Sequence, residues 1–208
     1  MRIKIICILL LFLNQTLYSQ NVSIPIEMFS SVDNFYYQHS FYKTIENSKF
    51  SFFNLSSIKK NYDQESKNNS YLFRNQLFYK IHKHWSLGLT GELTNKETKI
   101  RLGIQYLLKN KKLIVSIYSN ITASNIATFV NMLYLEYKPK ISDKVKFYSR
   151  FQIQTTIYFG KNTKYNNLYR IGVEFKSIKI GIGMPWFNPF SIKNLGTKHV
   201  GLFIGATL

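Results

Sequence analysis

The chain has 208 residues and a formal net charge of +18, with 28 Lys and Arg against 10 Asp and Glu. That length allows one domain or two small ones. The single cysteine, Cys7, lies in an apolar N-terminal stretch, so disulfides, thiolate chemistry and zinc–cysteine sites are excluded from the rest of the chain.

Residues 1–20 have the features of a signal peptide. Arg2 and Lys4 precede an unbroken apolar run at 5–13, which is too short to cross a bilayer as a helix. We therefore expect cleavage before Asn21 and export; a retained membrane anchor is the alternative. An exported chain meets little nucleic acid, so the excess of lysine predicts contacts with lipopolysaccharide phosphates and anionic lipid head groups, or simply solubilising turns.

Residues 144–159 show the clearest pattern in the chain. Their odd positions are mostly apolar and their even positions are polar or basic, as in a strand with two unlike faces. A strand of this length exceeds the ~5 to 6 residues usual in globular proteins. It is long enough for a membrane barrel, whose strands need ~9 to 11 residues to cross the hydrocarbon.

The same alternation continues along most of the chain and predicts an all-β, antiparallel, up-and-down transmembrane β-barrel. Counting from Lys49 gives about ten strands, within a range of eight to twelve. No charged residue falls on the apolar face of these strands, and an Arg or Lys facing lipid at mid-depth costs ~2 to 4 kcal/mol. The connections alternate between short and long, with the longest at one end, as in bacterial barrels.

This pattern divides the chain into three parts. Residues 1–20 are the signal peptide, residues 21–47 form an N-terminal arm or an extra hairpin, and residues 48–208 form the barrel. Including the hairpin gives twelve strands and keeps their number even. Aromatic residues are expected at both membrane interfaces. Those expected at the short-turn end are Tyr79, Trp85, Tyr106, Tyr137, Phe147 and Phe175.

The last residues show a resemblance to a known class of protein. A cleaved signal followed by alternating strands, the last one carrying Val200, Leu202, Ile204, Ala206 and Leu208, resembles the small outer-membrane β-barrel proteins of Gram-negative bacteria. The resemblance implies location in the cell outer membrane and contact with the barrel assembly machinery. Many such proteins end in an aromatic residue, whereas this chain ends in Leu208. No functional residue is carried over.

The polar face of the strands gathers the candidate site residues. We expect a charge network or an anion-binding site inside the barrel, formed by Arg74, Glu92, Lys99, Arg101, Arg150, Arg170 and Glu174. Turn positions predict that Glu92 lies across from Arg101, Glu136 near Lys146, and Glu174 near Lys179. The network serves either narrow anion permeation or only the packing of the barrel interior.

The sequence favours a structural, binding or permeation role over an enzymatic one. No catalytic residue, metal site, cofactor or small-molecule ligand is assigned. Two alternatives stay open. A lipid-modifying enzyme of the outer membrane would need His199 beside an inward Ser86, Ser116 or Thr207. A soluble periplasmic barrel or sandwich that binds a ligand would bury the apolar face instead. The apolar segment 185–190 is expected to fold over the barrel mouth.

Overall fold

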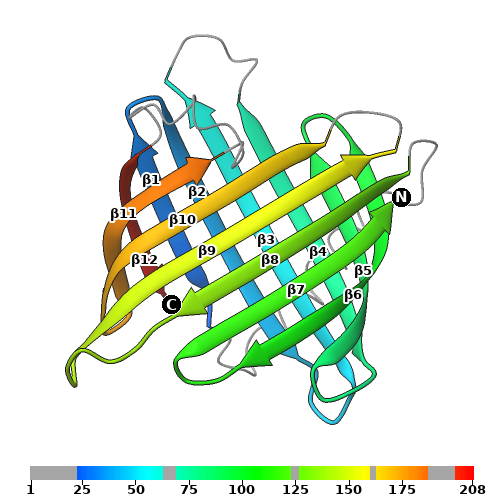
Figure 1. Ribbon diagram of the computed structural model, residues 1–208, viewed down its shortest axis with the longest axis horizontal. Helices are drawn as coiled ribbons and strands as arrows, with labels where there is room; N and C mark the ends of the chain where they lie inside the picture. The colour runs from blue at the N-terminus through cyan, green and yellow to red at the C-terminus, as the bar shows by residue number, and fades with distance from the viewer. Residues whose placement is uncertain (1–22, 63–68, 123–126, 160–162, 187–199) are drawn as a thin grey trace, which may run out of the picture.

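The computed structural model describes residues 23–62, 69–122, 127–159, 163–186 and 200–208. Within these ranges the chain forms twelve antiparallel strands that close into one barrel (Figure 1). Among the same residues, no helix is long and apolar enough to cross a membrane. The strands are β1 (Pro25–Ser31), β2 (Asn34–Thr44), β3 (Phe50–Asn61), β4 (Ser70–Lys80), β5 (Trp85–Thr94), β6 (Thr98–Lys109), β7 (Leu113–Thr122), β8 (Thr128–Tyr137), β9 (Val145–Tyr158), β10 (Lys164–Phe175), β11 (Ile178–Trp186) and β12 (Gly201–Thr207).

Each strand pairs with its neighbours in sequence, and β1 pairs with β12 to close the barrel. The closing register places Pro25 opposite Thr207 and Ser31 opposite Gly201. The preferred count of ten strands was therefore low by one hairpin. The segment 21–47 contributes β1 and β2, whose alternation is harder to recognise because the outward face of β2 mixes aromatic residues with His39 and Lys43.

The two ends of the barrel differ in their connections. β1 begins and β12 ends at the same end, where Ile24 and Leu208 exchange two backbone hydrogen bonds of 3.1 Å. Short connections such as 81–84, 110–112 and 176–177 lie there, whereas β11 ends at Trp186 and β12 begins at Gly201 at the opposite end (Figure 1). We call these the turn end and the loop end.

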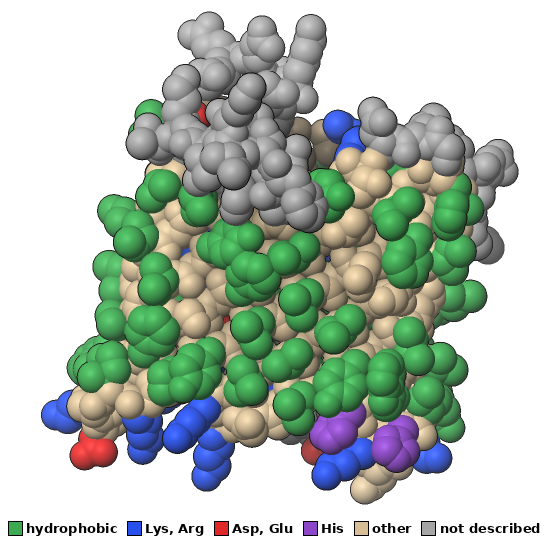
Figure 2. All heavy atoms as spheres, in the orientation of Figure 1, with side chains coloured by type: hydrophobic (Ala, Val, Ile, Leu, Met, Phe, Trp, Pro, Cys, Tyr) green, Lys and Arg blue, Asp and Glu red, His purple; other side chains and the backbone are tan. Residues whose placement is uncertain are grey.

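The outside of the barrel wall is apolar. On the face that Figure 2 shows, hydrophobic side chains cover the wall, and histidine and several Lys and Arg side chains lie at the turn end. Outward residues such as Leu89, Ile100, Leu102, Ile182 and Leu202 are 46% to 69% exposed. Exposed apolar surface on this scale is unfavourable in water and is the surface that a membrane barrel presents to acyl chains. The soluble periplasmic alternative is therefore wrong.

Aromatic rings lie near both ends of the outward face. At the turn end, Trp85 and Tyr106 contact each other with ring centroids 5.2 Å apart, and Phe50 and Tyr79 do so at 5.1 Å. Phe151 and Tyr169 make a similar contact at 4.7 Å on β9 and β10. Amphipathic rings at the two levels of the head groups are the usual girdles of membrane barrels.

The interior is polar, with two aromatic contacts within it. Tyr148 and Phe203 are at most 1% exposed and lie 5.7 Å apart, while Phe78 meets Tyr118 edge-on at 5.6 Å. Gly88 provides the space for the second contact, because a Cβ there would lie 2.8 Å from the Phe78 ring. Large side chains therefore occupy much of the barrel interior, as expected from the sequence.

Candidate functional site

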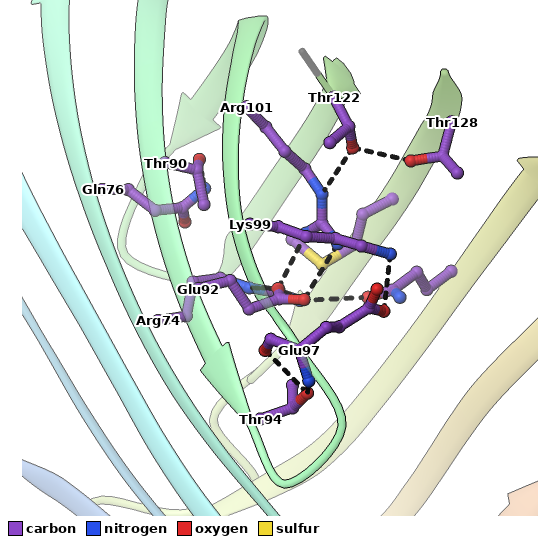
Figure 3. Close-up of polar contacts among 12 residues, drawn as sticks. Arg74, Gln76, Thr90, Glu92, Thr94, Glu97, Lys99, Arg101, Thr122 and Thr128 are labelled. Atoms are coloured by element: carbon purple, nitrogen blue, oxygen red, sulfur yellow. Dashed lines mark hydrogen bonds and ion pairs between the residues drawn. The ribbon is translucent and has the colours of Figure 1, made fainter. Parts of the chain in front are cut away.

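Arg74, Glu92 and Arg101 form the first of three charged groups inside the barrel; we call it the first cluster. They come from the adjacent strands β4, β5 and β6 and are 5% to 8% exposed. Arg101 contacts Glu92 in a bidentate manner, with Nη1 to Oε2 at 2.7 Å and Nη2 to Oε1 at 2.9 Å. Arg74 donates from Nε to Glu92 Oε2 at 2.8 Å (Figure 3). One carboxylate therefore serves two guanidinium groups.

Further polar contacts hold the first cluster in place. Arg101 Nε donates to Thr122 Oγ1 at 3.3 Å, and Thr122 in turn contacts Thr128 at 2.6 Å. Arg74 Nη2 reaches Gln154 Oε1 on β9 at 3.5 Å. Because β4 and β9 are not neighbours in the barrel wall, this last contact spans the interior and narrows it at that level.

The second cluster is formed by Glu27 on β1, Arg150 on β9 and Arg170 on β10. Arg150 Nη2 donates to Glu27 Oε1 at 2.8 Å, and Arg170 Nε donates to the same oxygen at 3.1 Å. The guanidinium carbon of Arg170 also lies 4.5 Å from the centroid of the Phe29 ring and 5.5 Å from that of Phe203. Buried Arg150 Nε and Arg170 Nη2 have no hydrogen-bond partner among the described residues.

The third cluster lies near the turn end. Glu174 contacts three lysines: Lys146 at 2.7 Å, Lys138 at 3.8 Å and Lys179 at 4.0 Å between charged atoms. Lys138 also contacts Glu136 at 2.8 Å, and Tyr134 donates to that carboxylate at 2.6 Å. Both glutamate side chains are 7% exposed, whereas that of Lys146 is 41% exposed. This cluster is therefore the most open to water of the three.

The structure distributes the predicted site residues over these clusters instead of one site. Arg74, Glu92 and Arg101 lie together, Arg150 and Arg170 lie together, and Glu174 belongs to the third cluster. Lys99 joins none of them. Its ammonium group contacts Glu97 at 2.6 Å and lies 5.7 Å from the Tyr158 ring centroid.

Two of the three predicted charge pairs need correction. Glu92 lies across from Lys99, because the turn is formed by Asn95 and Lys96 rather than one residue later; Arg101 reaches Glu92 diagonally. Glu136 does not contact Lys146 and lies across from Arg150. The predicted proximity of Glu174 and Lys179 is confirmed by their register and their 4.0 Å contact.

The Glu136 error has a local cause. The ladder between β8 and β9 continues beyond Tyr137 through a bridge between Lys140 and Lys146. The chain reverses beyond it, where Ile141 N and Ser142 N both donate to Val145 O. The chain therefore reverses closer to β9 than predicted, and the partner of each β8 residue lies four residues further along β9, so that Glu136 lies across from Arg150 instead of Lys146.

Two members of the clusters were absent from the prediction. Glu27 was missed because residues 21–47 were not assigned to the barrel wall with certainty. Lys138 was missed because it follows Tyr137, the last residue of β8, where the alternation of faces ends. The pattern of β1 gives little signal for Glu27, because Glu27 shares the inward face with the apolar Phe29 while Met28 faces outward.

The enzyme alternative and the predicted mouth segment both involve residues outside the described ranges. His199 and most of the segment 185–190 lie outside the described residues. Within the described ranges, no group of three or more His, Cys, Asp or Glu residues is arranged to hold a metal ion. The clusters contain acids, guanidinium groups and amines, which suits the binding of charged solutes.

Comparison with known proteins supports the fold. No protein-family model and no curated protein matches the chain. Among solved structures, the KdgM porin is similar at a TM-score of 0.54 and 10% identity, covering 89% of this chain and 98% of that one. The KdgM porin in complex with disordered oligogalacturonate is similar at a TM-score of 0.53 and 12% identity, with the same coverage of both chains. The NanC porin is similar at a TM-score of 0.55 and 11% identity, covering 90% of this chain and 98% of that one.

These identities are low, so the likeness shows the fold rather than the substrate. The chain has the closed, antiparallel β-barrel fold of outer-membrane porins, as its strand pattern predicted. The predicted location in the outer membrane agrees with this fold and with the apolar wall.

Proposed function

We propose that this protein is a narrow outer-membrane channel that prefers anions and passes small acidic solutes, with carboxylate-bearing saccharides as the substrate class. The observation that carries the proposal is the pair of unused donors in the second cluster. Arg150 Nε and Arg170 Nη2 are buried, positively charged and without a partner among the described residues. A carboxylate is a suitable partner, since charge-assisted guanidinium–carboxylate bonds are among the strongest in proteins.

The charge balance of the clusters supports anion preference. The first and second clusters each contain two arginines and one glutamate, and the third contains three lysines and two glutamates. Each therefore has one cation more than it has anions. Surplus positive charge lining a path favours anions and opposes cations.

The packing of the interior supports a narrow path. The contact between Arg74 and Gln154 spans the barrel, and the rings of Tyr148 and Phe203 fill another part of its cross-section. Wide aqueous channels are found in barrels of ~16 to 18 strands. Twelve strands with these side chains inside favour single small solutes or extended chains over bulk diffusion.

The substrate class rests on a similar fold with a known ligand. One of the matched structures is the KdgM porin in complex with disordered oligogalacturonate, an oligomer of acidic sugars. An extended chain of carboxylates would meet the three clusters in succession and could pair with the surplus cation of each.

The test is a planar-bilayer measurement with purified protein. Under a tenfold KCl gradient we expect a small, salt-dependent conductance whose reversal potential has the sign of anion selectivity. Arg150→Gln should reduce that selectivity because it removes one buried cation. Lys83→Gln removes the same charge from an exposed turn position and should leave the reversal potential unchanged.

The substrate is tested in the same bilayers. Oligogalacturonate added to one side should interrupt the current at lower concentration than a neutral oligosaccharide of equal length. A cation-selective conductance, or no conductance from protein whose folding is shown by its gel mobility before and after boiling, would contradict the proposed channel. Equal block by the charged and neutral sugars would contradict the substrate class alone.

A further inference from the structure

A polar side chain, Asn75, lies at the centre of the lipid-facing side of β4. The residues that share its face are Tyr71, Phe73, Leu77 and Tyr79, each 38% to 43% exposed. A strand rises ~3.3 Å per residue, so Asn75 is ~13 Å along the strand from each tyrosine. Because the tyrosines stand at the two head-group levels, Asn75 lies near the middle of the hydrocarbon layer.

The hydrogen bonds of Asn75 are incomplete. Asn54 Nδ2 on β3 donates to Asn75 Oδ1 at 2.8 Å, and Ser56 donates to Asn54 Oδ1 at 3.3 Å. Among the described residues the Asn75 amide group donates no hydrogen bond, and its side chain is exposed on the outside of the barrel. Lipid tails offer no acceptor, so an unpaired amide at this depth is unfavourable.

The neighbouring strands extend this surface. Gly91 on β5 lies directly opposite Asn75, and a Cβ added to it would meet nothing within 4 Å. His39 on β2 lies opposite Ser56, on the same outward face. We call His39, Asn54, Ser56, Asn75 and Gly91 the mid-membrane patch. It combines polar groups with a backbone surface open to close approach, as do protein interfaces within membranes.

We infer that the mid-membrane patch is the surface through which two copies of this chain associate in the membrane. A carboxamide is both a donor and an acceptor, so a two-fold axis beside Asn75 would bring its amide to the same group of the second copy. A two-fold interface of this kind needs one self-complementary surface. The apolar residues around it, Phe73, Leu77 and Leu89, are 40% to 46% exposed and would pack across the axis.

A second lipid-facing asparagine provides a comparison within the same barrel. Ser119 donates to Asn131 Oδ1 at 3.0 Å on the outside of β7 and β8. Asn131 lies three residues from the start of β8 and Ser119 three from the end of β7, near the loop end. Head groups and water are close at that level, so Asn131 does not need a protein partner and serves as a matched control.

Chemical cross-linking tests the inferred contact directly. The chain without residues 1–20 has no cysteine, so a single introduced cysteine is the only thiol. Gly91→Cys places one in the patch on β5, and Ile171→Cys places one on β10, five strands away around the barrel at an outward position that is 50% exposed. With a short bismaleimide at low protein-to-lipid ratio, we expect a cross-linked dimer for Gly91→Cys and at least fivefold less for Ile171→Cys.

A second measurement does not depend on the introduced cysteines. Asn75→Leu should lower the fraction of dimer in lipid at least threefold, whereas Asn131→Leu should leave it unchanged. Folding of both variants is verified by the mobility shift between boiled and unboiled samples. The inference is overturned if wild type is monomeric in lipid, if both cysteines cross-link equally, or if both leucine variants lose the dimer together. Channel conductance per barrel is expected to be the same in all of them, which separates this result from the proposed function.

Discussion

The first and second clusters hold the same groups, two buried arginines around one buried glutamate, but the chain assembles them differently. The first lies on three consecutive strands, and Glu92 accepts hydrogen bonds at both oxygens. In the second, Glu27 is 123 and 143 residues from its partners, and one oxygen serves both arginines. The first cluster is thus a local ion-pair network, whereas the second connects β1, one of the two strands that close the barrel, to β9 and β10.

The two clusters differ in how completely their arginines are paired, and we expect this difference to give the first cluster a role in stability and the second a role in function. A buried charge is stable only where counter-charge and hydrogen bonds offset its desolvation. Arg74 and Arg101 have these contacts on Glu92, Thr122 and Gln154. Arg170 relies in part on the rings of Phe29 and Phe203 and keeps a free donor. We therefore expect changes in the first cluster to act mainly on folding and changes in the second on ion selectivity.

Glu92→Gln should have the largest effect on stability. The substitution leaves two buried guanidinium groups without their carboxylate, and breaking a buried pair in this way costs ~3 to 5 kcal/mol. The free energy of unfolding in urea from lipid vesicles measures it. Glu97→Gln is the control, because the Glu97 side chain is 50% exposed and its pair with Lys99 should contribute ~0 to 1 kcal/mol. A Glu92→Gln barrel as stable as the control would contradict the structural role of the first cluster.

Glu27→Gln should lower stability less and change selectivity more. The loss of a charged hydrogen-bond acceptor costs ~2 to 3 kcal/mol, and the cation–π contacts of Arg170 partly stabilise the charge that remains. Removing the only acid of the second cluster should move the reversal potential further toward anions, which a bilayer under a salt gradient measures. If Glu27→Gln destabilised the barrel more than Glu92→Gln, the contrast between the two clusters would be reversed.

The sequence predicted the faces of the strands better than their partners. Side chains alternate with a period of two, so the inward position of Arg74, Glu92 and Arg101 follows from the pattern alone. Which residues meet depends on the turn. Moving the β5–β6 turn by one residue changed the partner of Glu92 from Arg101 to Lys99 and left both on the same face. The ion pair with Arg101 survived because long side chains reach diagonal neighbours.

The second cluster lay beyond such reasoning. Its members come from β1, β9 and β10, and their proximity is a consequence of barrel closure through β12. Alternation within single strands carries no information about which strands face each other across the interior. The polar atoms of the mid-membrane patch were missed for a related reason: Asn54 and Asn75 become a pair only once the register of β3 and β4 is known.

Gly183→Ala should have a smaller effect than either glutamate substitution, and it acts on the second cluster through shape alone. A Cβ at Gly183 would collide with Nη1 of Arg170 and lie 2.8 Å from its Cδ. Forcing extra volume into a packed site typically costs ~1 to 3 kcal/mol. Gly91→Ala is the control, measured on the monomeric barrel so that the mid-membrane patch is not engaged, because within one chain its Cβ meets open space. Equal unfolding free energies for the two variants would show that the Arg170 side chain can move without loss of stability. Its position over the Phe29 ring would then not be fixed by packing.

Lys146→Gln, in the third cluster, should have the smallest effect on stability of the substitutions compared here. The Lys146 side chain is 41% exposed, and Glu174 keeps Lys138 and Lys179 nearby when it is removed. Water screens such a pair, so we expect a change in unfolding free energy of ~0 to 1 kcal/mol. The reversal potential should nevertheless move away from anions, because a cation at a water-accessible position acts on passing ions without being needed for folding. Loss of stability comparable to Glu92→Gln would show instead that the third cluster belongs with the first, as part of the framework that keeps the barrel closed.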